Sequence, residues 1–435
     1  MQFYDRKSEI ETLQQIEARS AISAQMTTIV GRRRVGKTTL LKQAFNATPV
    51  LYFFIAKKNE VLLCEEFNRE VQEKLKVPLG SFNRFADLFK VLMHLSERIH
   101  FTLILDEFQE FNSINNSLFS EMQNIWDTYK EKSHINLILC GSIYSLMKRI
   151  FENSKEPLFG RATHKIVLKP FTIATIKDIL HDYSPTYTNE DLLFFFMVTG
   201  GVAKYIEQLV IRRAFTKETI LDTIFREDSF FLDEGRDVLI NEFGKDYGNY
   251  FSILSLIASS KTDRGAIESI LNISVGGYLE KLEKEYSIIT RLRPLMAKEG
   301  SRNNKYRIED NFLNFWFRFI YKYRSAIEIS NLQYVRDIVE RDYTIYSGLI
   351  LEKYFRYQMI ESRQYSTIQG YWNNKNENEI DIIGVNEMEK RIIFCEVKRN
   401  RNKINMELLH TKATEIAGKF PTFTKEYKGL SLDDM

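Results

Sequence analysis

The sequence predicts a multidomain α/β protein, with a parallel sheet in its amino-terminal half and a smaller sheet near its carboxyl end. Three observations lead to this fold class. The chain has 435 residues, which is more than one hydrophobic core usually supports. Its first half contains short, continuous apolar runs, which are typical of strands buried on both faces of a parallel sheet. Residues 379–398 have the pattern of two further strands joined by a polar turn.

Composition and charge exclude several classes of protein. The chain is 44% apolar and 27% charged with 7 prolines, which leaves little room for long disordered linkers. A net charge of +3 means that any basic surface for nucleic acid must be local. Cys64, Cys140 and Cys395 lie in apolar runs without metal-binding spacing, so we expect buried thiols. No apolar run reaches the roughly 18 to 20 residues that span a bilayer, and the amino terminus is polar. We therefore expect a cytoplasmic protein without a membrane partner.

The segment MTTIVGRRRVGKTTLLKQAF has the order apolar strand, glycine turn, helix. Two glycines let the backbone curl around phosphates so that its N–H groups point inward, a lysine reaches the β and γ phosphates, and a threonine hydroxyl binds Mg²⁺. The alternative is a chance turn rich in glycine and lysine, but the flanking strand and helix favour a phosphate loop. The residues predicted to bind ATP are Gly31, Arg34, Val35, Gly36, Lys37, Thr38 and Thr39.

A second apolar run, residues 101–105, ends in Asp106 and Glu107. Open α/β sheets place ligands at the carboxyl ends of their strands. There Asp106 can hold Mg²⁺ through water and Glu107 can polarise the attacking water. A strand that simply ends in exposed acids is the alternative, which the upstream phosphate loop disfavours.

Two further residues complete the predicted nucleotide site. Ser142 follows a third apolar strand, INLILCG, and is a candidate sensor of the γ phosphate; capping the next helix explains this serine equally well. Arg161 follows a glycine turn, in PLFGRATHK. It can act as an arginine finger across a boundary between subunits, or it can be a solvated loop residue. A role for Arg161 in trans requires a homo-oligomer.

These motifs resemble, in order, those of the archaeal-type ATPase family in the AAA+/STAND group of P-loop NTPases. The matching segments are FYDRKSEIETL, GRRRVGKTTLL, LILDEFQ, LCGSIYSLM, PLFGRA and VTGGVAKYIE. The resemblance implies an αβα nucleotide-binding core followed by a helical lid. The chain departs from the family where Ala203 follows the Gly-Gly-Val triplet, because relatives usually have proline there.

Residues 249–310 show three short helical patterns followed by two strand patterns, which is the order of a winged helix. The third helix, about 276–285, has as many glutamates as lysines in LEKLEKEY, so it is a poor candidate for binding in a DNA groove. The better candidates for phosphate contact are Arg291, Arg293, Lys298, Arg302 and Lys305. A protein-binding or spacer module of the same shape is the alternative. The aromatic residues of DNFLNFWFRFIYKY occur at helical spacing, which predicts a buried seam.

The stretch EIDIIGVNEMEKRIIFCEVK places three charges in a pair of apolar strands, over 380–385 and 392–398. Glu396 and Lys398 lie on one face, because alternate residues of a strand share a face. Charges there are costly unless they bind a partner. Asp381 and Glu396 can hold Mg²⁺, while Lys398 can orient the attacking water or offset phosphate charge. A surface hairpin whose charges pair with each other is the alternative.

Upstream, Glu352 lies at helical offsets from Ile345, Leu349, Phe355 and Met359, so we expect it inside a buried apolar stripe. With Asp381, Glu396 and Lys398, it resembles the pattern of the PD-(D/E)XK nuclease superfamily. QGYWNNKNENEIDIIGV and GLSLDDM also resemble the nuclease-like domain that often follows archaeal-type ATPases. A basic run beside the site suits a phosphate backbone; a solvated strand end is the alternative. It comprises Lys398, Arg399, Arg401 and Lys403.

The predicted architecture is a P-loop αβα sandwich with a helical lid, a winged-helix domain and a restriction-endonuclease-like α/β domain. The predicted boundaries are 1–172, 173–240, 241–325 and 335–435. The predicted function is that of an ATPase, with ATP and Mg²⁺ as cofactors, coupled to a carboxyl-terminal domain that binds DNA or cleaves it. The alternative is a nucleotide-operated switch or scaffold whose nuclease-like domain does not cut.

Overall fold

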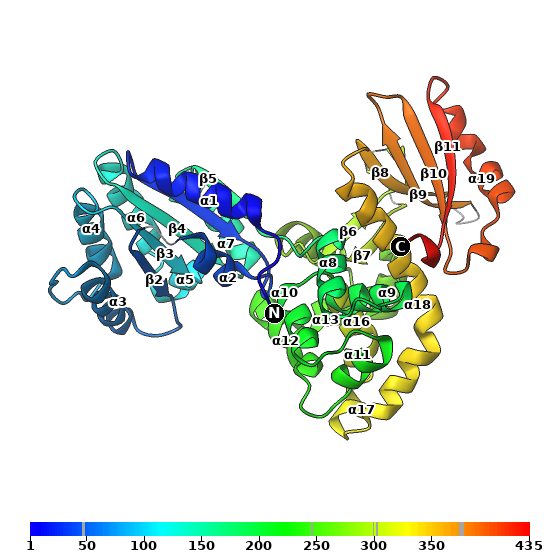
Figure 1. Cartoon of the computed structure of the whole chain (residues 1–435), viewed down its shortest axis with the longest axis horizontal. Coiled ribbons are helices and arrows are strands. Elements are labelled where there is room, and N and C mark those ends of the chain that lie inside the picture. Colours follow the sequence, from blue (N-terminus) through cyan, green and yellow to red (C-terminus); the bar gives the residue numbers. More distant parts are fainter. Residues whose placement is uncertain (46–47, 245–246, 299, 302, 374–377) are drawn as a thin grey trace. The chain divides into compact units, whose positions relative to one another are not determined.

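The computed structural model describes the whole chain except residues 46–47, 245–246, 299, 302 and 374–377. The chain forms two compact units (Figure 1). The amino-terminal unit is Asp5–Lys169, and the carboxyl-terminal unit combines Met1–Tyr4 with Pro170–Met435. Among the described residues, no helix is both long and apolar enough to cross a membrane.

The amino-terminal unit is built on a five-stranded sheet whose pairings are all parallel. The strand order is β2-β3-β4-β1-β5. The apolar runs of the sequence form the three central strands, and their side chains are buried because helices cover both faces. The strands are β1 (Gln25–Val30), β2 (Val50–Phe54), β3 (Phe101–Asp106), β4 (Ile135–Gly141) and β5 (His164–Val167).

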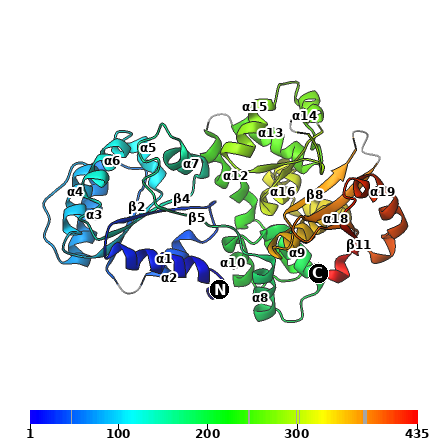
Figure 2. The same ribbon diagram turned by 90° about the horizontal axis from the view of Figure 1, so that it is seen from above.

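Helices cover the two faces of this sheet unequally. Leu13 of α1 and Leu40 of α2 pack with Ile29, Ile104 and Ile138 on one face. The larger cluster on the other face includes side chains of α3, α4, α6 and α7, and Figure 2 shows α5 to α7 opposite α1 and α2. The bounds are α1 (Lys7–Ser20), α2 (Lys37–Ala44), α3 (Glu60–Leu75), α4 (Phe85–Leu95), a 3-10 helix (Phe108–Glu110), α5 (Phe111–Ile114), α6 (Leu118–Tyr129) and α7 (Tyr144–Glu152). The predicted αβα core is confirmed.

The carboxyl-terminal unit begins with five helices, of which α9 is central. Every residue of α9 from Leu192 to Thr199 is buried, so this helix has no solvent-facing side in its second half. It starts with a reciprocal capping box between Thr188 and Asp191, which satisfies backbone N–H groups at its amino end. The helices are α8 (Ile173–Tyr183), α9 (Asn189–Thr199), α10 (Ala203–Ile211), α11 (Lys217–Ile224) and α12 (Phe230–Phe243).

Three helical segments and a hairpin follow, in the order that the sequence predicts. They are α13 (Tyr247–Ala258), α14 (Arg264–Leu271), α15 (Gly276–Glu280) continued by a π-helix (Lys281–Glu285), β6 (Ile289–Leu292) and β7 (Lys305–Ile308). The strands β6 and β7 pair antiparallel. The assignment of this segment as a winged helix stays a prediction.

The aromatic seam predicted after the hairpin is confirmed. It forms α16 (Asn311–Phe315) and a π-helix (Trp316–Tyr321). Phe312, Phe315, Trp316 and Phe319 are all fully or almost fully buried. The short α17 (Arg324–Glu328) and the long α18 (Leu332–Glu361) come next.

A four-stranded mixed sheet ends the chain, with strand order β11-β10-β9-β8. Its central hairpin, β9–β10, is antiparallel, and β11 pairs parallel with β10. Ile392 and Phe394 face α19 on one side, whereas Ile393 and Cys395 join the cluster that contains α18 on the other. The elements are β8 (Thr367–Trp372), β9 (Glu379–Asn386), β10 (Arg391–Val397), a 3-10 helix (Arg401–Lys403), α19 (Met406–Gly418), β11 (Thr424–Leu430) and a 3-10 helix (Leu432–Asp434). The predicted strand pair is confirmed.

Candidate functional site

The phosphate loop joins β1 to α2 through backbone conformations that glycine favours. Gly36 has φ of 98° immediately before α2, and Arg34 also has positive φ, at 74°. A Cβ at Gly31 would lie 2.8 Å from the backbone oxygen of Leu168, so no larger residue fits there without movement. The buried Val35 anchors the loop in the core, while Thr38 and Thr39 are exposed in the first turn of α2. This geometry matches the predicted phosphate cradle.

Lys37 is buried and turned onto its own loop. Its Nζ donates to the backbone oxygens of Gly31 at 2.7 Å and of Arg32 at 3.2 Å. Burial lowers the pKa of Lys37, and the charge of Glu107 acts in the opposite direction. An anion placed in the loop would therefore offer this ammonium a better partner than two neutral carbonyls.

Asp106 and Thr38 converge as Mg²⁺ binding requires. Thr38 Oγ1 lies 3.3 Å from Asp106 Oδ2, and the Tyr52 hydroxyl donates to the same oxygen. A hydroxyl and a carboxylate are the oxygen ligands that Mg²⁺ prefers, so these residues fit the ion. Tyr52 was missed by sequence reasoning. Its strand β2 pairs with β3, and a tyrosine on a strand beside the acidic one is a signal that could have identified it.

Glu107 is held by Ser142 in a strained conformation. Its φ of 56° lies in the left-handed region that non-glycine residues rarely adopt. Ser142 Oγ donates to Glu107 Oε2 at 2.7 Å, and the Gln109 amide donates to the same oxygen. The helix-cap interpretation of Ser142 is wrong, because α7 begins at Tyr144 with Ile143 at the cap position. Since β4 lies between β1 and β3, Ser142 stands between the phosphate loop and the acidic pair.

Arg161 lies in the same unit but pairs away from these groups. Its Nη2 is 3.1 Å from Asp127 Oδ2, and its Nη1 donates to the backbone oxygen of Phe159 at 2.9 Å. A role across a subunit boundary stays a prediction.

In the carboxyl-terminal unit, β9 and β10 bring Asp381, Glu396 and Lys398 together. Lys398 Nζ lies 2.7 Å from Glu396 Oε1 and 3.5 Å from Asp381 Oδ2. The backbone N–H of Val397 donates to Asp381 Oδ2 at 2.7 Å. Although burial opposes the charge of Lys398, the contacts with Glu396 and Asp381 raise its pKa. Both carboxylates thus share one cation. We call Glu352, Asp381, Glu396 and Lys398 the carboxylate site.

Glu352 lies close enough to affect Asp381. Burial, followed by repulsion from Glu352, raises the pKa of Asp381 to about 6. Glu352 itself pairs with Arg356 at 2.8 Å, and Arg356 also donates to the backbone oxygen of Asp381 at 2.8 Å. Within the described residues, no group of three or more His, Cys, Asp or Glu side chains has the arrangement of a metal site. Glu396 Oε2 is nevertheless buried at this site and accepts no hydrogen bond from any residue that the structure describes, and an unpaired buried oxygen suits a cation ligand.

The apolar stripe predicted around Glu352 is wrong. Ile345 is 76% exposed and Leu349 is 51% exposed, although Phe355 is buried as expected. The buried face of α18 instead contains Tyr346, Ile350 and Lys353. Lys353 tolerates burial because its Nζ donates to the backbone oxygen of Glu309, a partner remote in the sequence.

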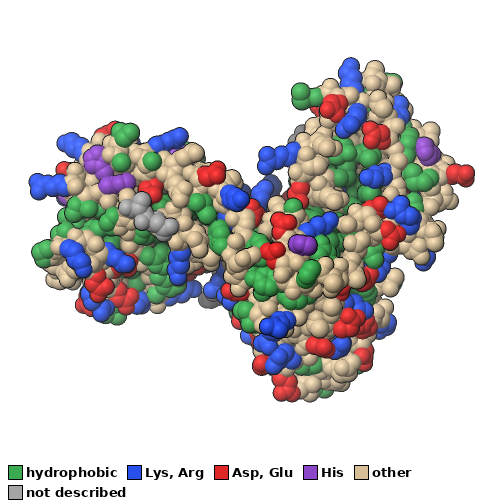
Figure 3. Space-filling model, in the orientation of Figure 1, with side chains coloured by type: hydrophobic (Ala, Val, Ile, Leu, Met, Phe, Trp, Pro, Cys, Tyr) green, Lys and Arg blue, Asp and Glu red, His purple; other side chains and the backbone are tan. Residues whose placement is uncertain are grey.

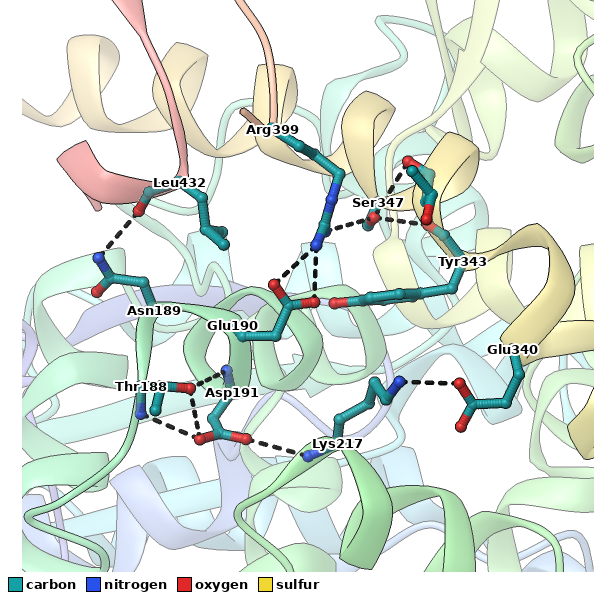
Figure 4. A network of polar contacts seen from close by, with 11 residues as sticks. Thr188, Asn189, Glu190, Asp191, Lys217, Glu340, Tyr343, Ser347, Arg399 and Leu432 are labelled. Carbon is teal, nitrogen blue, oxygen red and sulfur yellow. Dashed lines mark hydrogen bonds and ion pairs between the residues drawn. The ribbon is translucent and has the colours of Figure 1, made fainter. Parts of the chain in front are cut away.

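Arginines of the basic run beside Lys398 pair with acidic side chains. They therefore do not form the open basic surface that a phosphate backbone would need. Arg399 Nη2 donates to both carboxylate oxygens of Glu190 of α9, at 2.9 and 2.7 Å, and Arg399 Nη1 donates to Ser347 Oγ at 2.7 Å. Figure 4 shows its guanidinium between these two groups and beside the Tyr343 ring. Arg401 pairs with Asp434.

Two of the basic residues predicted to contact phosphate in the hairpin segment are also paired with acids. Arg291 lies 2.6 Å from Glu283, and Lys305 lies 2.9 Å from Glu379. Arg302 falls outside the described residues. Figure 3 shows Lys and Arg interspersed with Asp and Glu on the visible face of each unit. These pairs weaken the case for a basic stripe that reads a DNA groove.

Comparison with known protein families decides the identity of the first half. Residues 3–209 match the model of an ATPase domain found predominantly in Archaea. This segment is an archaeal-type ATPase domain. The match to the ATPase domain extends past Lys169 and through most of α10. Residues 316–414 match a second model, which describes archaeal and bacterial proteins of unknown function.

The chain is also similar to two further proteins. The uncharacterized protein MJECL04 of Methanocaldococcus jannaschii is 27% identical over 407 residues, which cover 91% of this chain and 87% of that protein. The Walker-type ATPase PABY2304 of Pyrococcus abyssi has a solved structure with a TM-score of 0.55 and 18% identity, covering 72% of this chain and 96% of its own. The second likeness shows a shared fold.

Proposed function

We propose that the ATPase domain hydrolyses ATP through Lys37, Thr38, Asp106 and Glu107, and that the carboxylate site is a metal-dependent centre that acts on the phosphodiester backbone of DNA. The first half of this proposal is the finer form of the family assignment. The second half is carried by one observation: Asp381 and Glu396 both pair with the Lys398 ammonium, while a buried oxygen of Glu396 has no hydrogen-bond donor among the described residues.

Each residue of the nucleotide site has a defined task. Lys37 exchanges its loop carbonyls for the β and γ phosphates. Thr38 would hold Mg²⁺ through its hydroxyl and Asp106 would hold it through water, and the bound ion would offset the charge of the phosphates. Glu107 polarises the attacking water, and Ser142 holds that carboxylate in position. Arg161 adds positive charge only if a second copy places it at the nucleotide.

In the carboxylate site, Asp381 and Glu396 provide hard oxygen ligands for a divalent ion. A bound ion would supply Lewis-acid polarisation of the phosphodiester. Lys398 is placed to orient the attacking water or to neutralise the phosphate. Burial, followed by the charge of Glu352, raises the pKa of Asp381 to about 6, so a bound divalent ion would favour its ionised form further.

The lid helices give a physical route for coupling the two activities. The amino end of α9 carries Glu190, which holds Arg399, the residue next to Lys398. A movement of α9 during the ATPase cycle would therefore displace the strand end that carries Lys398. The winged-helix segment is proposed to contribute further DNA contacts, despite its mixed charge.

The test is incubation of the full chain with plasmid DNA, ATP and either Mg²⁺ or Mn²⁺, beside an Asp381→Ala variant. We expect the unaltered protein to nick DNA and the variant to lose most of this activity, while both hydrolyse ATP at the same rate. Equal nicking by the two proteins would end the nuclease proposal and leave the ATPase proposal intact.

A non-cleaving switch or scaffold is the second candidate. It is favoured by the pairing of Lys398 with both carboxylates and by the absence of a three-ligand cluster in the part of the chain that the structure describes. Titration with Mn²⁺ separates the candidates, because a switch has no reason to bind the ion at Asp381 and Glu396. An Mn²⁺ affinity that is the same in the unaltered protein and in Asp381→Ala favours the switch.

A further inference from the structure

A second lysine lies at the carboxylate site. Lys412 Nζ is 3.6 Å from Glu396 Oε2, while Lys398 Nζ is 2.7 Å from Glu396 Oε1. The Glu396 side chain is only 9% exposed and that of Lys412 is 22% exposed. Each oxygen of this buried carboxylate therefore faces an ammonium group. The two lysines come from different elements, since Lys398 follows β10 and Lys412 belongs to α19.

The position of Lys412 on α19 is unusual for a lysine. It follows Leu409 by three residues and precedes Ile416 by four, and both of these are fully buried against the sheet. Residues at such offsets share one helical face. A lysine on a core-facing stripe normally extends its ammonium outward to water, whereas this one approaches a buried carboxylate.

The Lys412 ammonium offsets the charge of Glu396 but makes no hydrogen bond to it. Glu396 Oε2 is buried and has no hydrogen-bond donor among the residues that the structure describes. At 3.6 Å the Lys412 ammonium is too far away for a hydrogen bond. A buried acceptor without a donor is costly. Lys412 is thus a counter-charge that can leave Glu396 without breaking a hydrogen bond.

We propose that Lys412 is a phosphate-binding residue of the carboxylate site. Its ammonium neutralises Glu396 in the substrate-free protein, and it pairs with a phosphate of bound DNA once the carboxylate serves as a metal ligand. Lysine suits this task because it binds phosphate as a point charge on a flexible stem. This inference rests on the proposed function, because it needs both a metal and a phosphodiester at this site.

The test compares Lys412→Met with Lys419→Met in the full chain. Methionine keeps an apolar stem and removes the charge. Lys419 is the matched control, because it lies at the end of the same helix and is also 3.6 Å from a carboxylate, Glu415, but is 45% exposed. Calorimetry with Mn²⁺ alone measures the metal site. Fluorescence anisotropy of a short DNA duplex in Ca²⁺, over a range of salt concentrations, measures phosphate contacts.

Removal of Lys412 should strengthen Mn²⁺ binding by about 3- to 10-fold, because a like charge no longer opposes the ion. It should also weaken DNA binding and reduce the slope of log affinity against log salt by about one, the effect of one lost phosphate contact. Lys419→Met should change neither quantity.

The outcomes separate the inference from the function on which it rests. If the unaltered protein binds Mn²⁺ no better than Asp381→Ala does, the metal-centre proposal fails and the role of Lys412 fails with it. If the unaltered protein binds Mn²⁺ at the carboxylate site but Lys412→Met leaves either the Mn²⁺ affinity or the salt slope equal to that of Lys419→Met, only the role of Lys412 is overturned.

Discussion

The nucleotide site and the carboxylate site use the same residue types in opposite ways. In the first, Lys37 binds backbone carbonyls and leaves Asp106 and Glu107 to hydroxyl and amide donors. In the second, Lys398 binds the carboxylates themselves. In the nucleotide site the Lys37 ammonium has no anionic partner on its loop, so it is available for a phosphate. In the carboxylate site the Lys398 ammonium already pairs with both carboxylates, so a metal ion would have to compete with it. The difference suggests that the nucleotide site is prepared for phosphate and the carboxylate site is held closed by its own lysines.

The strongest test of the nucleotide site is Glu107→Gln. The amide keeps the size of the side chain and can still accept a hydrogen bond from Ser142, but it cannot polarise water as a carboxylate does. We expect kcat for ATP hydrolysis to fall by about 100- to 1,000-fold with ATP affinity nearly unchanged. Steady-state kinetics and nucleotide titration measure the two quantities. Glu110→Gln is the control, since that residue faces Lys57; an equal loss in both variants would remove Glu107 from the mechanism.

Lys37→Ala tests whether the buried ammonium is reserved for phosphate. Because hydrogen bonds to charged groups contribute about 1.5 to 3 kcal/mol each, ATP affinity should fall by roughly 100-fold. Mn²⁺ affinity at the carboxylate site should stay the same, which would show that the two sites are chemically independent. Titration calorimetry measures both. The exposed Lys42 of α2 provides the control variant; unchanged ATP affinity in Lys37→Ala would refute the phosphate-loop assignment.

Asp381→Asn tests the cost of charge in the carboxylate site. The folded-state pKa of about 6 lies above the ordinary value of 3.8, so the folded state binds the proton more tightly. Stability is therefore greatest below about pH 4 and declines as pH rises to about 6, by up to roughly 3 kcal/mol. The variant should be more stable than the unaltered protein at pH 7.5 in EDTA, by about 2 kcal/mol, and should lose this advantage near pH 4. Urea unfolding at both pH values measures it; an advantage that does not depend on pH would rule out ionisation of a buried Asp381 as its cause.

The smallest expected effect concerns the tie between α9 and the carboxylate site. Glu190→Gln removes the charge that Arg399 binds, and we expect a loss of about 1 kcal/mol in unfolding free energy. The control is Asp222→Asn, which weakens the more exposed pair between α11 and Arg336 and should cost less than about 0.5 kcal/mol. Mn²⁺ affinity should change only in Glu190→Gln. The same loss in both variants would make the Glu190–Arg399 pair an ordinary surface contact.

The features predictable from sequence were those whose chemistry is local. The phosphate loop, the acidic end of β3 and the β9–β10 hairpin each occupy a short run of residues, and the structure forms these elements at the positions that the spacing implies. The partner of Ser142 was not predictable in this way. Its hydroxyl binds Glu107, 35 positions earlier, and only the order of the strands places the two together.

The error at α18 has a physical reason of the same kind. Period and polarity favoured a stripe through Ile345 and Leu349, but the buried face contains Tyr346 and Lys353. Lys353 can be buried because Glu309 lies beside it, and although burial opposes ionisation, Lys353 and Arg307 lower the pKa of that carboxyl to about 2. When the partner of a buried polar residue lies far away in the sequence, the neighbouring residues do not reveal the burial. Lys412 was missed for the same reason.

The packing of α9 determines how the second half of the chain should come apart. One continuous set of buried side chains extends from Ile176 and Leu193 through Phe312 and Trp316 to Ile393 and Leu430, so the helices α8–α12, the hairpin segment and the face of the last sheet that packs on α18 share one interior. Heating should melt them in a single calorimetric transition. A gene fragment that begins near residue 335 would expose the apolar side chains that α18 buries against the earlier helices, so we expect it to be poorly soluble.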